Sequence, residues 1–154
     1  GTSSSAATIP ISVESTLKNG ISRPVANFVI PLCATIHLSG SMIKLTLYAF
    51  AIVYMANLDI STSTGLGFIF LLGIMMIAAP GVPGGAVMVA AGLLADMMGF
   101  DDGMVALMIA AYIAIDSVGT AANVTGDGAI AMILDKFVGN REDATKEELT
   151  DPTA

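Results

Sequence analysis

Apolar residues along this chain fall into five stretches that are separated by short polar or glycine-rich connections. The stretches cover residues 6–19, 24–56, 65–79, 86–98 and 104–134. At about 1.5 Å per residue, the second and the fifth are long enough, as helices, to cross a hydrocarbon core of about 30 Å. The pattern therefore predicts an all-α membrane protein with two spanning segments.

The third and fourth stretches are shorter and are joined by Pro80-Gly81-Val82-Pro83-Gly84-Gly85. As helices, 65–79 and 86–98 would each be roughly 20–22 Å long, which is too short to cross alone. Irregular backbone at membrane depth is tolerated only where protein or a cavity surrounds it. We therefore expect a re-entrant helical hairpin with residues 80–85 at its tip.

A stripe of polar residues follows one face of the fifth stretch, which we expect to form one continuous helix. Asp116, Thr120, Asn123 and Asp127 return to within roughly 40° of one line along a helix that turns about 100° per residue. Carboxylates in hydrocarbon are costly and persist where they line a site or a pathway. The stripe predicts a solute or ion site, and buried groups in a structural role are the alternative. An aspartyl protease is excluded because the two carboxylates would lie roughly 16 Å apart, whereas a catalytic dyad shares a proton.

The second stretch is interrupted near its middle by Thr35-Ile36-His37-Leu38-Ser39-Gly40-Ser41. A break frees backbone carbonyls, and many secondary transporters hold cations at unwound helix near the midplane of the bilayer. The alternative is a glycine kink with a lone buried histidine. Lys44 follows within the same span, and we expect its ammonium group either to reach the interface or to pair.

The composition agrees with a membrane setting. Hydrophobic residues make up 55% of the 154 residues and charged residues only 12%, which is about half the usual share in soluble domains. A net charge of −7 without a basic tract excludes a nucleic-acid-binding surface. Cys33 is the single cysteine, so an internal disulfide is excluded. The chain begins at Gly1 without signal-peptide features, and we expect it to be a piece of a longer protein.

Charge is distributed unevenly between the connections. Apart from Lys44, the basic residues flank the first and last spans, at Lys18, Arg23, Lys136, Arg141 and Lys146. The connections 57–64 and 96–103 hold four aspartates and no Lys or Arg. The positive-inside rule then predicts that both ends are cytoplasmic and both middle connections external. Two spans and one re-entrant hairpin agree with this topology.

Four motifs occur in series along the chain: Ser3-Ser4-Ser5-Ala6-Ala7-Thr8-Ile9-Pro10, Pro31-Leu32-Cys33-Ala34-Thr35-Ile36-His37-Leu38-Ser39-Gly40-Ser41, Gly81-Val82-Pro83-Gly84, and Asp116 with Asn123-Val124-Thr125-Gly126-Asp127. In this order they resemble the dicarboxylate/amino acid:cation symporter family, the glutamate-transporter-like secondary carriers. The resemblance covers only the C-terminal transport core of that family. It implies the tip and second arm of a first re-entrant hairpin at 1–20, the broken seventh transmembrane helix at 21–58, the second hairpin at 63–99, the final transmembrane helix at 102–138 and an acidic cytoplasmic tail at 139–154.

The resemblance also implies the residues of the site. The positions that match substrate-binding residues are Ser4, Ser5, Ser41, Val82, Gly84, Asp116, Thr120 and Asn123. Among these, Asp116 matches the carboxylate that receives an amino acid's ammonium group. One sodium site is implied at Asp127 with the carbonyls of Cys33, His37 and Asn123, and a second at the carbonyls of Thr35 and of the stretch from Met76 to Ala79.

Two departures from the family pattern change these expectations. Ser39 replaces a carboxylate that usually binds a further sodium ion in the family, and hard cations favour carboxylates. We therefore expect fewer coupled sodium ions. A histidine such as His37 can gain a proton near neutral pH, so we expect a proton in partial replacement. Gly119 stands where carriers of acidic amino acids have an arginine. Unless Lys44 takes the place of that guanidinium, we expect a neutral or small polar amino acid as substrate.

Together these features predict a symporter that takes up an amino acid by alternating access, coupled to sodium or a proton, with no enzyme activity and no cofactor. The first alternative is a carrier of dicarboxylates or acidic amino acids, which is disfavoured because Asp116 would repel a dianion unless it is protonated or paired. The second is a non-transporting membrane subunit or sensor derived from the family. The expected surroundings are a bacterial-type inner membrane, an N-terminal scaffold region of the same protein and a homotrimer.

Overall fold

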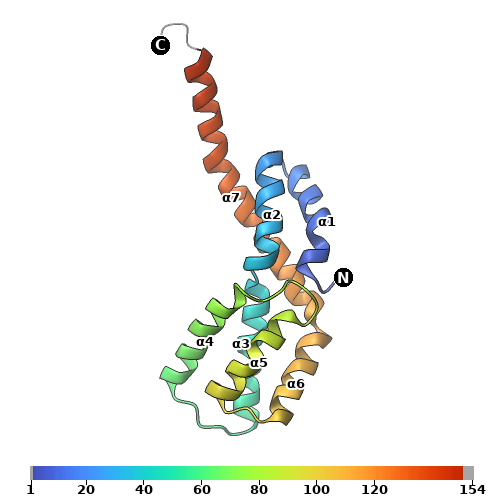
Figure 1. Ribbon diagram of the computed structural model, residues 1–154, viewed down its shortest axis with the longest axis vertical. Coiled ribbons are helices and arrows are strands. Elements are labelled where there is room, and N and C mark those ends of the chain that lie inside the picture. Colours follow the sequence, from blue (N-terminus) through green and yellow to red (C-terminus); the bar gives the residue numbers. More distant parts are fainter. Residues whose placement is uncertain (1, 151–154) are drawn as a thin grey trace.

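The computed structural model describes residues 2–150 and the side chains of residues 2–138. Within these residues, the regular structure is entirely α-helical, as the apolar pattern predicts. The seven helices are α1 (Ser5–Lys18), α2 (Arg23–Ile36), α3 (Ser39–Met55), α4 (Thr62–Met76), α5 (Gly85–Met98), α6 (Asp102–Ala114) and α7 (Asp116–Thr150). Helices α1, α2 and α3 pack on α7, and α3 to α6 pack on one another (Figure 1).

The first broken helix forms where the sequence predicts it. Helix α2 ends at Ile36 and α3 begins at Ser39, so the backbone leaves the helical path at His37 and Leu38. The N–H of His37 still donates to the carbonyl of Cys33 at 2.8 Å, which closes the last turn of α2.

The expectation of one continuous helix over 104–134 is wrong. The chain breaks at Ile115, and α6 and the part of α7 up to Val138 are bent by 63° relative to each other. In a continuous helix the carbonyl of Tyr112 would pair with a backbone N–H four residues later. Here it accepts a hydrogen bond from Nζ of Lys44 at 3.2 Å. A contact from a distant helix therefore accompanies the break, and the local sequence does not reveal it.

Two short helices, α4 and α5, form the hairpin that the sequence predicts over 65–79 and 86–98. The chain reverses between Met76 and Gly85, and Gly84 there has φ +73°, a left-handed conformation that glycine adopts without strain. Fully buried side chains such as Phe68 and Leu94 pack this hairpin against α3 and α6. The turn is thereby held against the break between α6 and α7.

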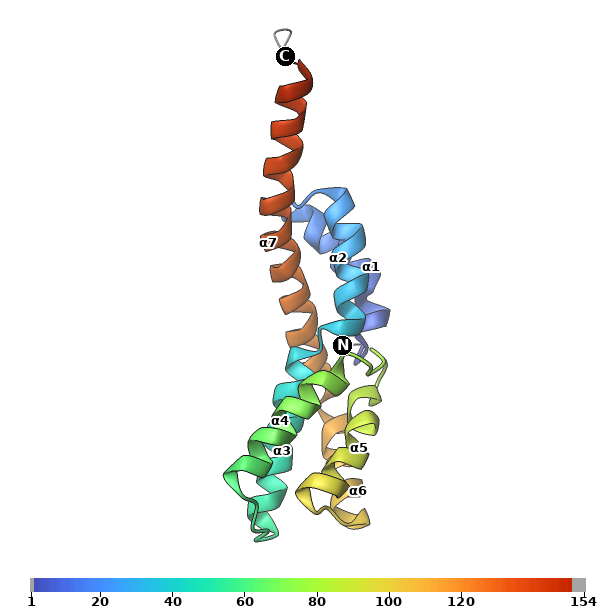
Figure 2. The same ribbon diagram turned by 60° about the vertical axis from the view of Figure 1, so that its left-hand side comes forward.

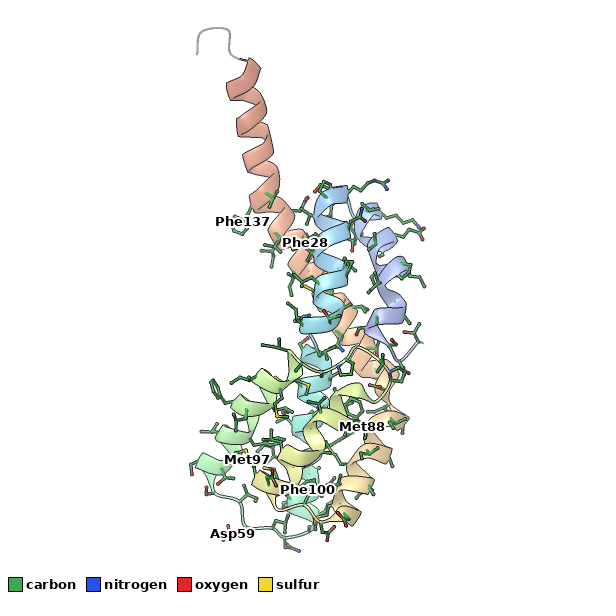
Figure 3. The ribbon with its side chains drawn as sticks, viewed as in Figure 1. Phe28, Asp59, Met88, Met97, Phe100 and Phe137 are labelled. Atoms are coloured by element: carbon green, nitrogen blue, oxygen red, sulfur yellow. The ribbon has the colours of Figure 1, made fainter. Side chains whose placement is uncertain are left out.

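Three connections lie away from the two helix breaks and the hairpin turn, toward opposite ends of the molecule (Figure 1). Asp59, between α3 and α4, and Phe100, between α5 and α6, are at the same end (Figure 3). The connection between α1 and α2 lies toward the other end (Figures 1 and 2). The acidic connections are thus separated in space from Lys18 and Arg23.

Much of the helical surface is apolar. Phe28, Met88 and Phe137 are 69%, 62% and 67% exposed (Figure 3), and many further large apolar side chains share this exposure. In the described part of the chain, Arg23–Met55 is long and apolar enough to cross a bilayer, and the bent pair of α6 and α7 adds a second crossing if it counts as one span. Contiguous exposed apolar surface on this scale marks contact with lipid or with other protein segments.

Candidate functional site

A small cavity lies where the two helix breaks and the turn of the hairpin meet. It is lined by Ser3, Ser5, Leu38, Ser41, Pro80, Gly81, Val82, Ala86, Tyr112, Asp116, Thr120 and Asn123. Six of the eight positions implied for substrate therefore line one space. Its volume is about 10 Å³, which leaves room for about one water molecule. A larger solute would therefore enter only if the walls moved.

Four helices begin around this cavity. Helices α1, α3, α5 and α7 start at Ser5, Ser39, Gly85 and Asp116, respectively. Each helix N-terminus places the positive end of its helix dipole near the cavity. Such termini bind carboxylate and phosphate groups readily. The cavity is therefore favourable for a carboxylate.

Asp116 is the buried carboxylate at the wall of the cavity, and both of its oxygens are occupied. Its Oδ1 atom accepts from Nζ of Lys44 at 2.9 Å, and its Oδ2 atom accepts from the N–H of Gly84 at 2.9 Å. The Lys44 side chain is 7% exposed. Lys44 therefore pairs rather than reaching the interface, and Asp116 links α3 to the hairpin turn.

Asn123 connects three helices at the opposite wall. Its Oδ1 atom accepts from the N–H groups of Gly40 at 2.8 Å and of Ser41 at 3.4 Å. Its amide nitrogen donates to Oγ of Ser41 at 3.1 Å and to Oγ of Ser5 at 3.5 Å. The side chain of Asn123 is thus fully engaged with protein groups.

The N-terminal end of α1 holds the hairpin turn directly. Oγ of Ser4 donates to the carbonyl of Gly81 at 2.8 Å, and the N–H of Ala6 donates to the same carbonyl at 3.1 Å. Oγ of Ser4 also accepts from the N–H of Ala7, which caps α1. Two segments that are far apart in the sequence thus close over the cavity.

The substitution Ser4→Ala is expected to loosen this closure. It removes one of the two bonds to Gly81, at a cost of about 1 kcal/mol, or about fivefold in the open population. Hydrogen exchange of the peptide 80–85 should speed up by that factor. Ser61→Ala is the matched control, because Ser61 caps α4 through the N–H of Thr64 and makes no contact with the turn. Equal exchange in the two variants would show that Ser4 does not restrain the turn.

Asp127 forms a second polar centre one turn beyond Asn123. It is 0% exposed, and its Oδ1 atom lies 2.8 Å from Nδ1 of His37 at the first helix break. Among the described side chains, its Oδ2 atom is the one buried polar atom without a hydrogen-bond partner. A buried carboxylate oxygen without a partner is costly, so this atom is the natural place for a bound cation.

The other implied sodium ligands lie at helix ends or beside Asp127. The carbonyl of Cys33, in the last turn of α2, accepts from the N–H of His37, whose ring contacts Asp127. The carbonyl of Met76, the last residue of α4, accepts from the N–H of Ala79 at 3.3 Å. The hydroxyl of Thr35 donates to the carbonyl of Leu32. Carbonyls at helix C-termini favour cations.

The sequence does not identify the partner of Lys44. It predicts only that Lys44 reaches the interface, forms a pair or replaces the missing guanidinium, whereas its partner Asp116 lies 72 residues away in the chain. A lysine inside an apolar span is itself a signal, since such a group is retained where it has a partner.

The sequence was compared with known proteins. The sequence model described as the sodium:dicarboxylate symporter family matches residues 1–137. The chain is 29% identical to the neutral amino acid transporter B(0) of Oryctolagus cuniculus over 97% of its own length and 28% of that protein. It is 30% identical to excitatory amino acid transporter 1 of Rattus norvegicus over 88% of its length and 25% of that protein. The chain therefore spans little more than a quarter of the curated relatives that it matches.

Proposed function

Since this chain belongs to the sodium:dicarboxylate symporter family, we propose that it forms the transport core of a sodium-coupled symporter of an amino acid in the membrane. The observation that carries the proposal is the small polar cavity at the meeting point of two helix breaks and a hairpin turn. Discontinuous helices that point their N-termini at an anionic group are typical of secondary transporters. The function is transport, so no bond of the substrate is made or broken.

The walls of the cavity suggest how an amino acid would bind. The carboxylate would lie at the N-termini of the helices and the hydroxyl groups of Ser5, Ser41 and Thr120. The ammonium group would approach Asp116. Gly119 offers no cation for a second carboxylate, which favours a neutral or small polar side chain. The relatives named as neutral amino acid transporters support this choice.

A dicarboxylate or an acidic amino acid is the second candidate. The ion pair between Lys44 and Asp116 removes much of the repulsion that an isolated Asp116 would exert on a dianion. The description of the family supports this candidate as well.

The coupling ion is proposed to bind at Asp127. The cluster would combine its carboxylate with the carbonyls of Cys33, His37 and Asn123, and a second site would use those of Thr35, Met76 and Ala79. Within the described residues, no three His, Cys, Asp or Glu side chains gather closely enough to hold a metal ion. A sodium ion would therefore depend on backbone carbonyls, which suit a hard cation. A proton on His37 is the alternative to one sodium ion.

The remaining parts of the proposal concern the membrane. The hairpin of α4 and α5 would be re-entrant and would open and close over the substrate, with Val82 and Gly84 in its tip. The chain termini would be cytoplasmic in a bacterial-type plasma membrane, which the separation of basic and acidic connections supports. An N-terminal scaffold region would surround this core in a homotrimer.

Uptake by the full-length protein in liposomes tests the function. A panel of labelled alanine, serine, aspartate and succinate would be offered under an imposed sodium gradient and, separately, an imposed pH gradient. We expect sodium-driven uptake with alanine or serine preferred over aspartate. Proton-driven uptake would instead assign the coupling to His37, and preference for succinate would select the second candidate. No uptake under either gradient would favour a non-transporting subunit or sensor.

A further inference from the structure

The ammonium group of Lys44 reaches Asp116 from the side that faces away from the cavity. Asp116 lines the cavity, whereas Lys44 is absent from its wall. Lys44 instead lines an apolar groove between α3 and α7, together with Ile43, Leu47 and Val118. The charge of Asp116 is therefore compensated from outside the cavity, and Lys44 does not occupy the cavity itself.

The position of Lys44 is specified by three separate contacts. Its Nζ atom lies 2.9 Å from Oδ1 of Asp116, 3.2 Å from the carbonyl of Tyr112 and 3.5 Å from the centroid of the Tyr112 ring. An ammonium group has three donors, and these contacts engage it on all sides. It has no free donor that points into the cavity, so it does not hold a substrate carboxylate directly.

Gly119 provides the space that this arrangement requires. A Cβ atom at Gly119 would lie 3.2 Å from Nζ and 3.3 Å from Cε of Lys44. A longer side chain at this position would therefore displace the ammonium group. The ammonium group of Lys44 can therefore occupy its position only because Gly119 has no side chain.

The ion pair changes which charged groups of a substrate the cavity attracts or repels. A lone buried carboxylate would strongly attract an ammonium group and repel a carboxylate. With a cation 2.9 Å from Oδ1 and an N–H on Oδ2, both effects are largely cancelled. We propose that Lys44 is a specificity-determining residue that lets this cavity accept small carboxylates whether or not they carry an α-ammonium group. The inference rests on the proposed transport function and extends its substrate class to 2-hydroxy acids.

Matched pairs of substrates test this inference in the purified full-length protein. Sodium-dependent binding would be measured for alanine and lactate, serine and glycerate, and aspartate and malate, which differ within each pair only in an ammonium or hydroxyl group. For a pair that binds, the wild-type affinities should lie within about tenfold of each other. The measured quantity is the ratio of the affinity for the amino acid to the affinity for its hydroxy analogue. Lys44→Met should raise this affinity ratio by a factor of about 10 to 100, the effect of one hydrogen bond to a charged group.

Two further variants keep the test decisive if Lys44→Met fails to fold. In the double variant Lys44→Met/Asp116→Asn, positions 44 and 116 together again carry no net charge. The ratio of amino acid affinity to hydroxy acid affinity should therefore return to the wild-type value. Asp116→Asn alone leaves the ammonium group uncompensated and should shift the ratio about tenfold toward the hydroxy acid. The elution profile and melting temperature in detergent identify variants that are folded.

The outcomes separate this inference from the proposed function. A wild-type protein that binds an amino acid in a sodium-dependent manner but discriminates strongly against its hydroxy analogue would overturn the inference and leave the function standing. An unchanged affinity ratio in Lys44→Met, or a ratio in the double variant that stays at the Lys44→Met value, would also overturn it. Absence of sodium-dependent binding of every compound by the wild type would overturn both.

Discussion

Asp127→Asn is expected to lower the sodium affinity of the protein about 10- to 100-fold, because it removes the charge from a buried carboxylate with a free oxygen. Asp127 is 0% exposed, its Oδ1 atom faces His37, and its Oδ2 atom has no partner among the described side chains. Asparagine has nearly the same volume and retains one carbonyl oxygen, so the packing should survive. The measurement is the affinity for the preferred substrate at a series of sodium concentrations.

The control for this variant is Asp96→Asn, which removes the same charge from an exposed position on α5. It should leave the sodium dependence unchanged. If Asp127→Asn behaves like this control, a cation does not bind at Asp127, and the coupling site lies elsewhere. If it instead abolishes a dependence on pH while sodium dependence persists, the pair of His37 and Asp127 carries a proton.

The sequence predicts those parts of the fold that depend on local pattern. The two arms of the hairpin are short because Pro80 to Gly85 interrupt the apolar run, and the break at His37 and Leu38 coincides with polar and small residues. The polar stripe keeps its register because Asp116 to Asp127 all lie within α7. Periodicity and interruption are properties of neighbouring residues, so they can be read from the chain.

The bend at Ile115 could not be predicted in this way. Neither a proline nor a glycine marks the bend, and its neighbour Asp116 belongs to a polar stripe that also fits a continuous helix. The groups that hold it are the carbonyl of Tyr112 and the carboxylate of Asp116, both bound by Lys44 from a different helix. The same long-range contact changes the environment of Asp116 from a lone carboxylate to one side of an ion pair. Tertiary contacts therefore determine both the bend and the charge of the site.

Helices α3 and α7 pack closely at Gly40. Gly40→Ala should destabilise the core by about 1–3 kcal/mol, the usual cost of overpacking. A Cβ atom at this position would lie 2.6 Å from Cβ of Ala122 and 2.6 Å from the carbonyl oxygen of Gly119. Neither neighbour is a flexible side chain, so the helices must separate. Their separation would also lengthen the bond from the N–H of Gly40 to Asn123, now 2.8 Å, and substrate affinity should fall together with stability.

Gly128→Ala is the matched control, because a Cβ atom there would meet nothing within 4 Å. In a helix, alanine is favoured over glycine by roughly 0.5–1 kcal/mol, so this variant should be as stable as the wild type or more so. The melting temperature in detergent and the substrate affinity would be compared for both variants. Because the intrinsic helix preference acts in the same direction at both sites, a loss at Gly40 alone measures the contact between α3 and α7. Equal stability of the two variants would mean that these helices approach less closely than the structure indicates, and that Asn123 is positioned by Ser5 and Ser41 instead.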